Sequence, residues 1–299
     1  MSLHDYIERI HGERCVQKLT NRLRGGDSNE RGNTFESEFA VHKITSLYLA
    51  GCSFRNVAVV HQAEDYVDDL SCDYVGSPRK ENYQLKDAKR VNWGEIGTSM
   101  IADDFLIQHD INVNFHQKSD SRTILIVSDE SLQRSLSNRC PEEIATHTEC
   151  CYFNAESFNS LLVANDEQVL PFKQLCAFPN ETDKVTKVHQ AMLGAWTTLK
   201  SAPTTVGAVV QAAVDGYKPG YFNLGNGMDI SVAFQERLDR VSDLRYSIEN
   251  GYFVYDILGM LSGSMPIDSP EFQELEMALE RNTVTEWEGF VRILSRGAL

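Results

Sequence analysis

The stretch VVHQAEDYVDDLSCDYVGSPRKENYQLKDAK, residues 59–89, decides the fold class that we expect for this chain. Within it, two runs of strand-forming residues at 70–75 and 82–86 stand on either side of the turn signal Gly-Ser-Pro. Two short strands joined by such a turn form a β-hairpin. The hairpin begins beside a pair of aspartates and ends in Gln-Leu-Lys, so acidic and basic side chains meet at one end of it.

The segments around the hairpin alternate between helical and strand patterns. A helix with one apolar face is predicted at 35–50, and the continuous apolar run TILIV at 123–127 has the length of a buried central strand. The other predicted elements are a strand at 56–60, a helix at 93–107, a helix at 129–137 and a strand at 149–153. This order indicates an α/β fold in which helices flank a mixed sheet.

The chain changes character beyond about residue 180. Long helical patterns dominate there and are separated by Gly and Pro breaks, at 184–199, 205–214, 231–251 and 269–281. We therefore expect two domains, an α/β domain over residues 1–175 and a mainly α-helical domain over residues 176–299.

The net charge of −15 is unevenly distributed along the chain. Residues 1–60 carry eight Lys and Arg against seven acids, with basic side chains gathered around a predicted helix at 3–24, whereas residues 201–299 carry seven against fourteen. A phosphate backbone attracts basic surfaces and repels acidic ones. The N-terminal segment is therefore the better candidate for nucleic-acid contact, and the C-terminal half is expected to serve assembly or regulation.

Composition also bears on where the protein works. No apolar stretch approaches the ~20 residues of a membrane span, and the first residues lack the apolar core of a secretory signal, so we expect a cytoplasmic protein without membrane contact. The seven cysteines are irregularly spaced and include no CxxC pair, which argues against a disulfide framework or a zinc ribbon. His147, Cys150 and Cys151 form a local cluster with ligand chemistry, which we interpret as part of a buried strand.

Candidate catalytic residues lie at the open end of the hairpin. Gln84 and Lys86 are two apart on one strand and point to the same face, and Asp69 lies on the partner strand. A carboxylate and a second oxygen ligand can hold a hard cation such as Mg²⁺ or Mn²⁺. A lysine beside them can orient the attacking water and offset charge on a phosphate. The pattern predicts metal-assisted hydrolysis of a phosphodiester bond.

A further metal ligand is predicted on the helix that precedes the sheet. On a helical wheel Glu36 shares the core-directed face, whereas Glu38 points roughly the other way, so we favour Glu36. The aspartate is less sharply defined, because Asp68 and Asp73 belong to the same acidic segment as Asp69 and are alternatives to it.

Other polar residues near the hairpin have weaker claims to a role. His61 lies close to the expected site and could help to position a phosphate. Lys89 and Arg90 follow the hairpin directly and could contact a phosphate, although exposed loop residues of this kind are common.

This set of residues resembles the PD-(D/E)xK nuclease superfamily. The resemblance rests on Phe35-Glu36 in the first helix, Asp69 at the start of the second strand, and Gln84 and Lys86 at the end of the third. It implies a restriction-endonuclease-like core in which Lys86, Gln84, Asp69 and Glu36 are catalytic and the last three bind Mg²⁺ or Mn²⁺.

More narrowly, the chain is similar to the endonuclease domain at the N-terminus of CBASS and Lamassu antiphage effectors. Those domains carry an acidic pair at the start of the second strand, as in Asp68-Asp69, and QxK in place of ExK. They also often carry a Trp after the lysine, matched here by Trp93. The resemblance covers residues 31–165, and the C-terminal half matches no pattern of this kind.

We therefore expect a metal-dependent endonuclease of double-stranded DNA, the effector of a bacterial antiphage system. The resemblance implies restraint by defence partners such as an SMC-like ATPase, and a homo-oligomer in the active form. Two alternatives stay open. One is a stand-alone restriction or repair nuclease whose C-terminal domain binds DNA, for example through a helix-turn-helix-like segment at 185–214. The other is a non-catalytic protein–protein adaptor with a degenerate nuclease fold.

Overall fold

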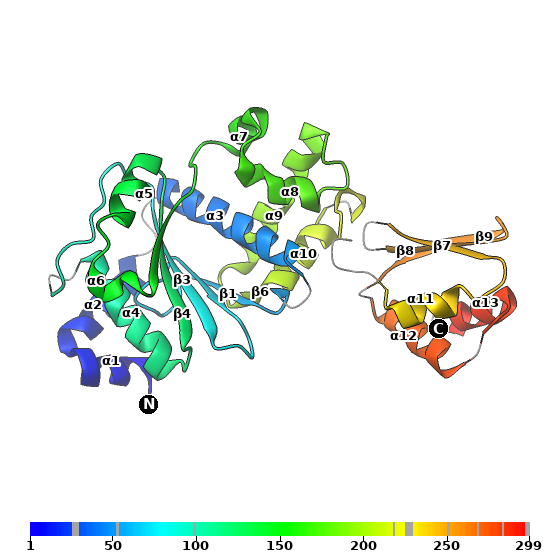
Figure 1. Ribbon diagram of the computed structural model, residues 1–299, viewed down its shortest axis with the longest axis horizontal. Helices are drawn as coiled ribbons and strands as arrows, with labels where there is room; N and C mark the ends of the chain where they lie inside the picture. Colours follow the sequence, from blue (N-terminus) through cyan, green and yellow to red (C-terminus); the bar gives the residue numbers. More distant parts are fainter. Residues whose placement is uncertain are drawn as a thin grey trace.

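A computed structural model describes residues 1–25, 30–51, 54–97, 100–217, 219–224, 230–249, 252–267, 269–282 and 284–296. Within these ranges the chain forms an α/β unit with a six-stranded sheet, followed by a smaller unit with a three-stranded sheet (Figure 1). The predicted α/β class with a mixed sheet flanked by helices is confirmed.

The large sheet has the strand order β5-β4-β3-β2-β1-β6. Strand β2 is antiparallel to both β1 and β3, β6 is antiparallel to β1, and β4 and β5 run parallel to β3. The strands are β1 (Ala58–His61), β2 (Leu70–Asp73), β3 (Arg79–Lys86), β4 (Asp120–Val127), β5 (Thr148–Tyr152) and β6 (Thr204–Thr205). The predicted hairpin is β2–β3, and its register sets Ser71 opposite Asn82.

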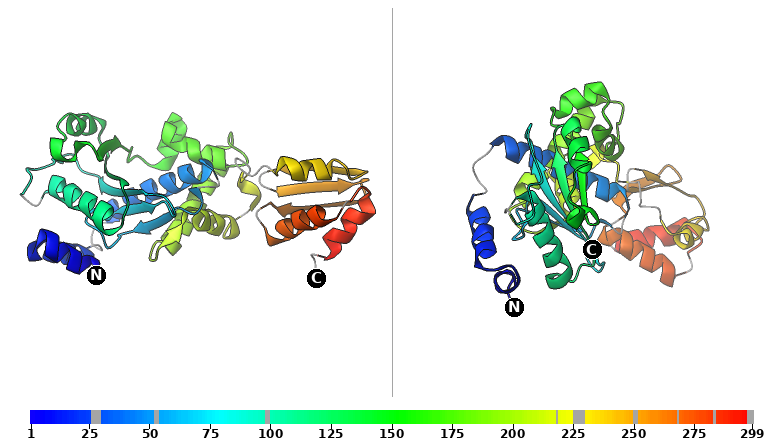
Figure 2. Two further views of the ribbon diagram at one scale, coloured as in Figure 1. Left: turned by 60° about the horizontal axis from the view of Figure 1, so that its bottom comes forward. Right: turned by 60° about the vertical axis from the view of Figure 1, so that its left-hand side comes forward.

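Helices cover both faces of this sheet, as the two views of Figure 2 also show. Helix α3 (Glu30–Leu49) lies against one face of the sheet. Three further helices pack on α3, namely α8 (Leu170–Leu175), α9 (Thr182–Leu199) and α10 (Val206–Asp215). Helix α4 (Ile101–Asp110) continues into a π-helical turn over Ile111–Phe115 and lies against the other face. The remaining helices here are α5 (Glu130–Ser137), α6 (Glu142–Ala145) and α7 (Phe158–Ala164), with single 3₁₀ turns at Glu167–Val169 and Pro219–Tyr221.

The apolar run in β4 explains how the sheet is held between two layers. Ile124 and Ile126 belong to the core shared with α3, whereas Leu125 and Val127 belong to the core shared with α4. Successive residues of a strand point to opposite faces, so a strand buried on both sides needs apolar residues at every position. The expected buried central strand is confirmed, and it lies between β5 and β3.

The N-terminal segment forms two helices where one was expected. Helix α1 (Leu3–His11) ends at Gly12, whose φ of +85° is accessible to glycine at little cost, and α2 (Glu13–Gly25) follows at once. Tyr6, Ile7 and Leu19 form a small core with Tyr66 and Ile111, which attaches these helices to the sheet unit near α4. The other difference in this half is that the predicted helix at 93–107 begins only at Ile101.

The expected boundary at residue 175 does not divide the core. One apolar cluster runs from Phe35 to Leu224 and includes the buried faces of α9 and α10. Residues 176–224 therefore pack with the sheet unit, because the apolar faces of α9 and α10 are buried against α3. A separate cluster begins with Ile230 and ends with Leu294.

The last unit is α+β, so the expectation of a mainly helical C-terminal domain is wrong for residues 230–296. Strands β7 (Leu244–Glu249), β8 (Tyr252–Ile257) and β9 (Leu261–Pro266) form an antiparallel sheet in that order. Helices α11 (Val232–Leu238), α12 (Pro270–Arg281) and α13 (Trp287–Arg296) share an apolar core with it. The helix predicted at 231–251 fails because its second half alternates, with Leu244, Tyr246 and Ile248 on the core side.

Candidate functional site

The β2–β3 hairpin brings Asp69, Gln84 and Lys86 together at its open end. Extending the register from the pair Ser71–Asn82 sets Asp69 opposite Gln84, so these side chains and that of Lys86 lie on the face of the sheet that carries α4. Oδ2 of Asp69 accepts hydrogen bonds from the backbone N–H of Leu85, at 2.6 Å, and from the side-chain amide of Gln84. The aspartate is therefore held by the strand opposite.

Glu36 reaches the same cluster from α3. Its Oε2 lies 3.2 Å from Nε2 of His61, a β1 residue, so the carboxylate is tied to a second strand of the sheet. Burial raises the pKa of Asp69, and the negative charge of Glu36 raises it further, whereas the charge of Lys86 and the two hydrogen bonds oppose the rise. Two carboxylates and one ammonium are thus close enough for their charges to interact.

The less certain candidates fall in different places. Asp68 adjoins Asp69 and is partly exposed. Asp73 lies at the other end of β2, where Nζ of Lys118 is 2.5 Å from its Oδ1; four residues of strand separate it from Asp69 by about 13 Å. Glu38 points to α9, and its Oε2 is 2.8 Å from Nε2 of His189. Neither Asp73 nor Glu38 joins the cluster around Asp69.

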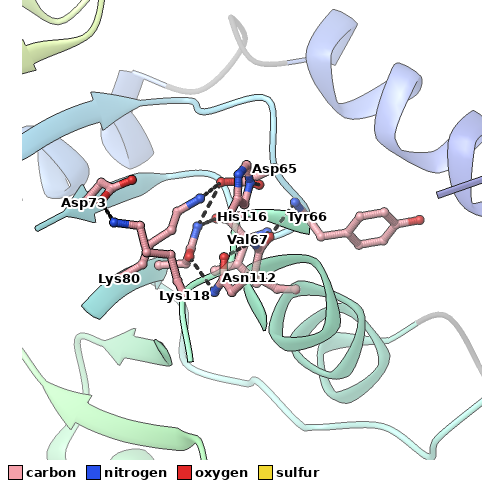
Figure 3. A network of polar contacts seen from close by, with 10 residues as sticks. Asp65, Tyr66, Val67, Asp73, Lys80, Asn112, His116 and Lys118 are labelled. Atoms are coloured by element: carbon pink, nitrogen blue, oxygen red, sulfur yellow. Dashed lines mark hydrogen bonds and ion pairs between the residues drawn. The ribbon is translucent and has the colours of Figure 1, made fainter. Parts of the chain in front are cut away.

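A second polar network, which the sequence patterns did not predict, surrounds Asp65 (Figure 3). Asp65 is buried, with its Oδ2 2.8 Å from Nζ of Lys80 and 3.2 Å from the amide of Asn82, and its Oδ1 is 3.3 Å from Nε2 of His116. Asn112 donates to Asn82 and so links the network to the turn after α4. The alternation along β3 places Lys80, Asn82 and Gln84 on one face of the strand, but the sequence gives no sign that this face is buried.

The charges of this network explain the state of Asp65. Burial alone would raise the pKa of its carboxyl, but the hydrogen bond from His116 and the charge of Lys80 outweigh burial and lower it to about 2. The ordinary value is near 4, so the ionised form stabilises the fold above that pH. The stabilisation is lost as the pH falls from about 4 through about 2.

The donor set at Asp69 is one of oxygen ligands. In the described part of the chain no group of three or more His, Cys, Asp and Glu side chains is placed to hold a metal ion. A cation at this cluster would therefore rely on the carboxylates of Glu36 and Asp69, the amide oxygen of Gln84, and water. Hard cations accept such ligands. The catalytic and metal-binding roles of these residues remain predictions.

The histidine and cysteines of the β5 region are not arranged as ligands. His147 stacks on His109 with 3.7 Å between the ring centroids, and burial, together with His109 and Arg122, lowers its pKa to about 4. Burial raises the pKa values of the Cys150 and Cys151 thiols. Thiols that stay protonated are poor metal ligands. The segment is a strand, as interpreted, but it lies at the edge of the sheet, and Cys150 and Cys151 are only half-buried.

The raised pKa of Asp69 leads to a prediction on stability. Above the pKa in the folded state, the ionised carboxylate opposes folding, because its burial is only partly offset by Lys86. Asp69→Asn should therefore leave the free energy of unfolding unchanged or raise it by up to about 1 kcal/mol at neutral pH. Mg²⁺ should raise the melting temperature of the wild-type protein and not that of the variant.

The matched control is Asp73→Asn, since Asp73 lies at the far end of β2. This variant should keep the response to Mg²⁺. Thermal unfolding with and without 10 mM Mg²⁺, a roughly saturating level for a weak site, measures both effects. An Asp69→Asn protein that still responds to Mg²⁺ like the wild type would contradict the assignment of Asp69 as a ligand.

No protein-family model and no curated protein match the chain. Two solved structures are similar to it, both of the Acinetobacter baumannii Cap4 SAVED/CARF-domain containing receptor, one with the cyclic trinucleotide 3'3'3'-cAAA and one with 2'3'3'-cAAA. The TM-score is 0.41 in each case, with 11% and 12% sequence identity, over 62% and 64% of this chain. The matches cover 45% and 47% of those chains, so this chain spans less than half of their length.

One further observation concerns membranes. Among the helices of the described residues, none is long and apolar enough to cross a bilayer.

Proposed function

We propose that this chain is a metal-dependent endonuclease that hydrolyses phosphodiester bonds of double-stranded DNA, with a PD-(D/E)xK-type core. The observation that supports the proposal is the gathering of Asp69, Gln84 and Lys86 at one end of the β2–β3 hairpin, with Glu36 beside them. A rigid strand pair keeps such groups in a constant geometry, which is what hydrolysis of a phosphodiester requires.

The residues present fit a bound Mg²⁺ or Mn²⁺. Burial and the like charge of Glu36 both disfavour the ionised form of Asp69. Within the described part of the chain its hydrogen bonds all use Oδ2. Glu36, Asp69 and the amide oxygen of Gln84 would hold the cation. When bound, the cation would lower the pKa of a water and polarise a phosphoryl oxygen.

The other residues of the cluster would orient the ligands and stabilise charge. The N–H of Leu85 and the amide of Gln84 hold Asp69, and the imidazole of His61 holds Glu36. The ammonium of Lys86 would stabilise negative charge that develops on the phosphate as the bond breaks. Lys89 and Arg90, which are exposed directly after β3, would contact the DNA backbone.

The packing of the C-terminal half disfavours a stand-alone restriction or repair nuclease. The segment 185–214, a candidate helix-turn-helix, contributes buried residues of α9 and α10 to the core shared with α3. Residues 201–299 are also acidic, with seven bases against fourteen acids. For the unit that contains β7, β8 and β9 we propose a role in assembly or restraint. The antiphage setting, an SMC-like ATPase partner and a homo-oligomeric active form remain predictions from the resemblance.

Cleavage should depend on a hard divalent cation. Supercoiled plasmid incubated with the purified chain should be nicked or linearised with Mg²⁺ or Mn²⁺, and excess EDTA should abolish the reaction, because oxygen ligands select such ions. The assay is run with and without candidate partner proteins, since restraint or activation could lie with them. Cleavage that continues in excess EDTA would contradict the proposed chemistry, and a chain inert under every condition would favour a non-catalytic adaptor.

A further inference from the structure

A cavity of about 320 Å³ lies beside α3, next to the catalytic cluster along the chain. Its lining includes Phe35, the neighbour of Glu36, and Asp87, the neighbour of Lys86. Pockets that bind small molecules begin at roughly 300 Å³, so the volume suits a single heteroaromatic group with little else. The proposed cleavage chemistry does not use this cavity.

Aromatic side chains form much of its wall. Phe35 and Phe153 meet edge to face with 5.8 Å between their ring centroids, and Phe158 and Phe172 do so at 5.2 Å. Phe158 also stacks on the imidazole of His189 at 3.8 Å. These contacts hold the rings in place before a ligand enters, and flat aromatic surfaces favour a flat aromatic guest.

Two polar side chains of the cavity, Glu38 and His42, have hydrogen-bonding atoms that a ligand could use. Glu38 is held through Oε2 by His189, and among the described residues its Oε1 has no hydrogen-bond partner. The imidazole of His42 lines the cavity and likewise forms no hydrogen bond with the described residues. Burial lowers the pKa of His42 to about 4, so at neutral pH the ring offers one N–H donor and one bare nitrogen acceptor.

The lining contains carboxylates and, in the part of the chain that the structure describes, no lysine or arginine. Glu38, Asp87 and Glu156 would repel a phosphate, so the cavity does not suit a nucleotide that enters phosphate first. A carboxylate oxygen accepts hydrogen bonds and cannot donate them. The part of the ligand inside should therefore present a hydrogen-bond donor to Glu38 and no negative charge.

We propose that this cavity binds a nucleobase that bears an exocyclic amino group, with its sugar and phosphate outside. The amino group donates to Glu38, His42 pairs with a ring nitrogen, and the phenylalanines pack on the base. The base comes from an unpaired position of the substrate strand or from a free nucleoside. The first of these sources rests on the proposed nuclease function, whereas the second does not.

The test uses the full 299-residue chain and four free nucleosides without added metal. Cytidine carries an exocyclic amino group where uridine carries an oxo group. Adenosine and inosine differ in the same way among the purines. Titration followed by ligand-observed NMR should show cytidine and adenosine binding about tenfold more tightly than uridine and inosine, the effect of one well-made hydrogen bond. Equal affinities within each pair, or no binding of any of the four, would overturn the proposal.

Two variants and a control locate the binding. Glu38→Gln should lose the preference for the amino-bearing bases, because an amide can donate as well as accept. Ala155→Trp, at an exposed lining position where a larger side chain should not disturb the core, should block the cavity and abolish binding. Glu143→Gln, at an exposed position outside the lining, should leave affinity and preference unchanged. Binding that survives Ala155→Trp would place the nucleoside elsewhere and overturn the proposal.

A second arm identifies the source of the base. Metal-free binding is compared for DNA duplexes with a single unpaired cytosine or a single unpaired thymine. A cytosine preference that Ala155→Trp removes assigns the cavity to a base of the strand, and nucleoside binding without that preference assigns it to a free ligand. Because no step requires cleavage, a protein that binds cytidine yet never cuts DNA would refute the proposed nuclease and leave the cavity assignment intact.

Discussion

Lys86→Ala should lower the rate of DNA cleavage by about 10²–10³-fold and leave the protein folded. Loss of one group that stabilises transition-state charge has effects of this size. Lys86 is the last residue of β3 and is partly exposed, so its truncation should change the free energy of unfolding by no more than about 1 kcal/mol. Single-turnover cleavage with Mg²⁺ and urea unfolding measure the two quantities.

The matched control for this variant is Lys89→Ala. Lys89 is an exposed lysine three positions further along the chain and outside the strand. It should weaken DNA binding at moderate salt and keep most of the cleavage rate, because a backbone contact contributes affinity and not chemistry. If purified Lys86→Ala cut DNA as fast as the wild type, the site would have to be sought elsewhere.

The largest effect on stability is expected for Asp65→Ala. This change leaves Lys80, whose side chain is 6% exposed, with a buried charge and without the carboxylate that the structure provides. Removing one partner of a buried ion pair costs about 3–5 kcal/mol, and Asn82 loses an acceptor as well. Urea unfolding at neutral pH measures the loss, and the wild-type protein should lose a part of this stabilisation as the pH falls from about 4 through about 2.

Two comparisons separate burial from charge in this second prediction. Asp73→Ala breaks the ion pair with Lys118 at a carboxylate that is 38% exposed, and it should cost no more than about 1 kcal/mol. The double variant Asp65→Leu with Lys80→Met replaces both charges by apolar groups and should recover most of the loss. A single Asp65→Ala variant no less stable than Asp73→Ala would contradict the role assigned to the network.

The hairpin and the residues at its end were accessible from the sequence because they depend on local rules. Strand residues alternate in direction, so the spacing of Gln84 and Lys86 was enough to place them on one face. The turn between the two strands aligned Asp69 with them once its register was set. The central strand could also be predicted from the sequence, because a strand that is buried on both faces has a continuous apolar run.

Helical periodicity in the sequence also favoured Glu36 over Glu38 as the metal ligand. The structure agrees in sending the two side chains to different partners, His61 for Glu36 and His189 for Glu38. Periodicity could not show that Glu38 would instead face a cavity, since most of the other lining residues lie at 153–172, more than 100 positions away. Helical periodicity therefore predicted the direction of the Glu38 side chain but not the residues that it contacts.

Three features required the tertiary structure. Asp65 and Lys80 are 15 residues apart, and a pair of charges gives no sign in the sequence of whether it is exposed or buried. Helices α9 and α10 have apolar faces that would suit a separate domain equally well, and only their packing on α3 assigns them to the first core. Leu244, Tyr246 and Ile248 stand at alternate positions, as in a strand, yet they follow a true helix directly, and the helix predicted at 231–251 extended over them.

Features that depend on neighbouring residues could be predicted from the sequence, whereas features that depend on contacts between distant segments could not. The sequence by itself determined the α/β class, the β2–β3 hairpin and the side chains gathered at its end, because these depend on backbone periodicity and on residues close together along the chain. The tertiary structure decided the extent of the core, the buried Asp65–Lys80 pair and the cavity beside α3. Burial and electrostatics depend on which distant segments come into contact, and that information lies in the packing rather than in any local stretch.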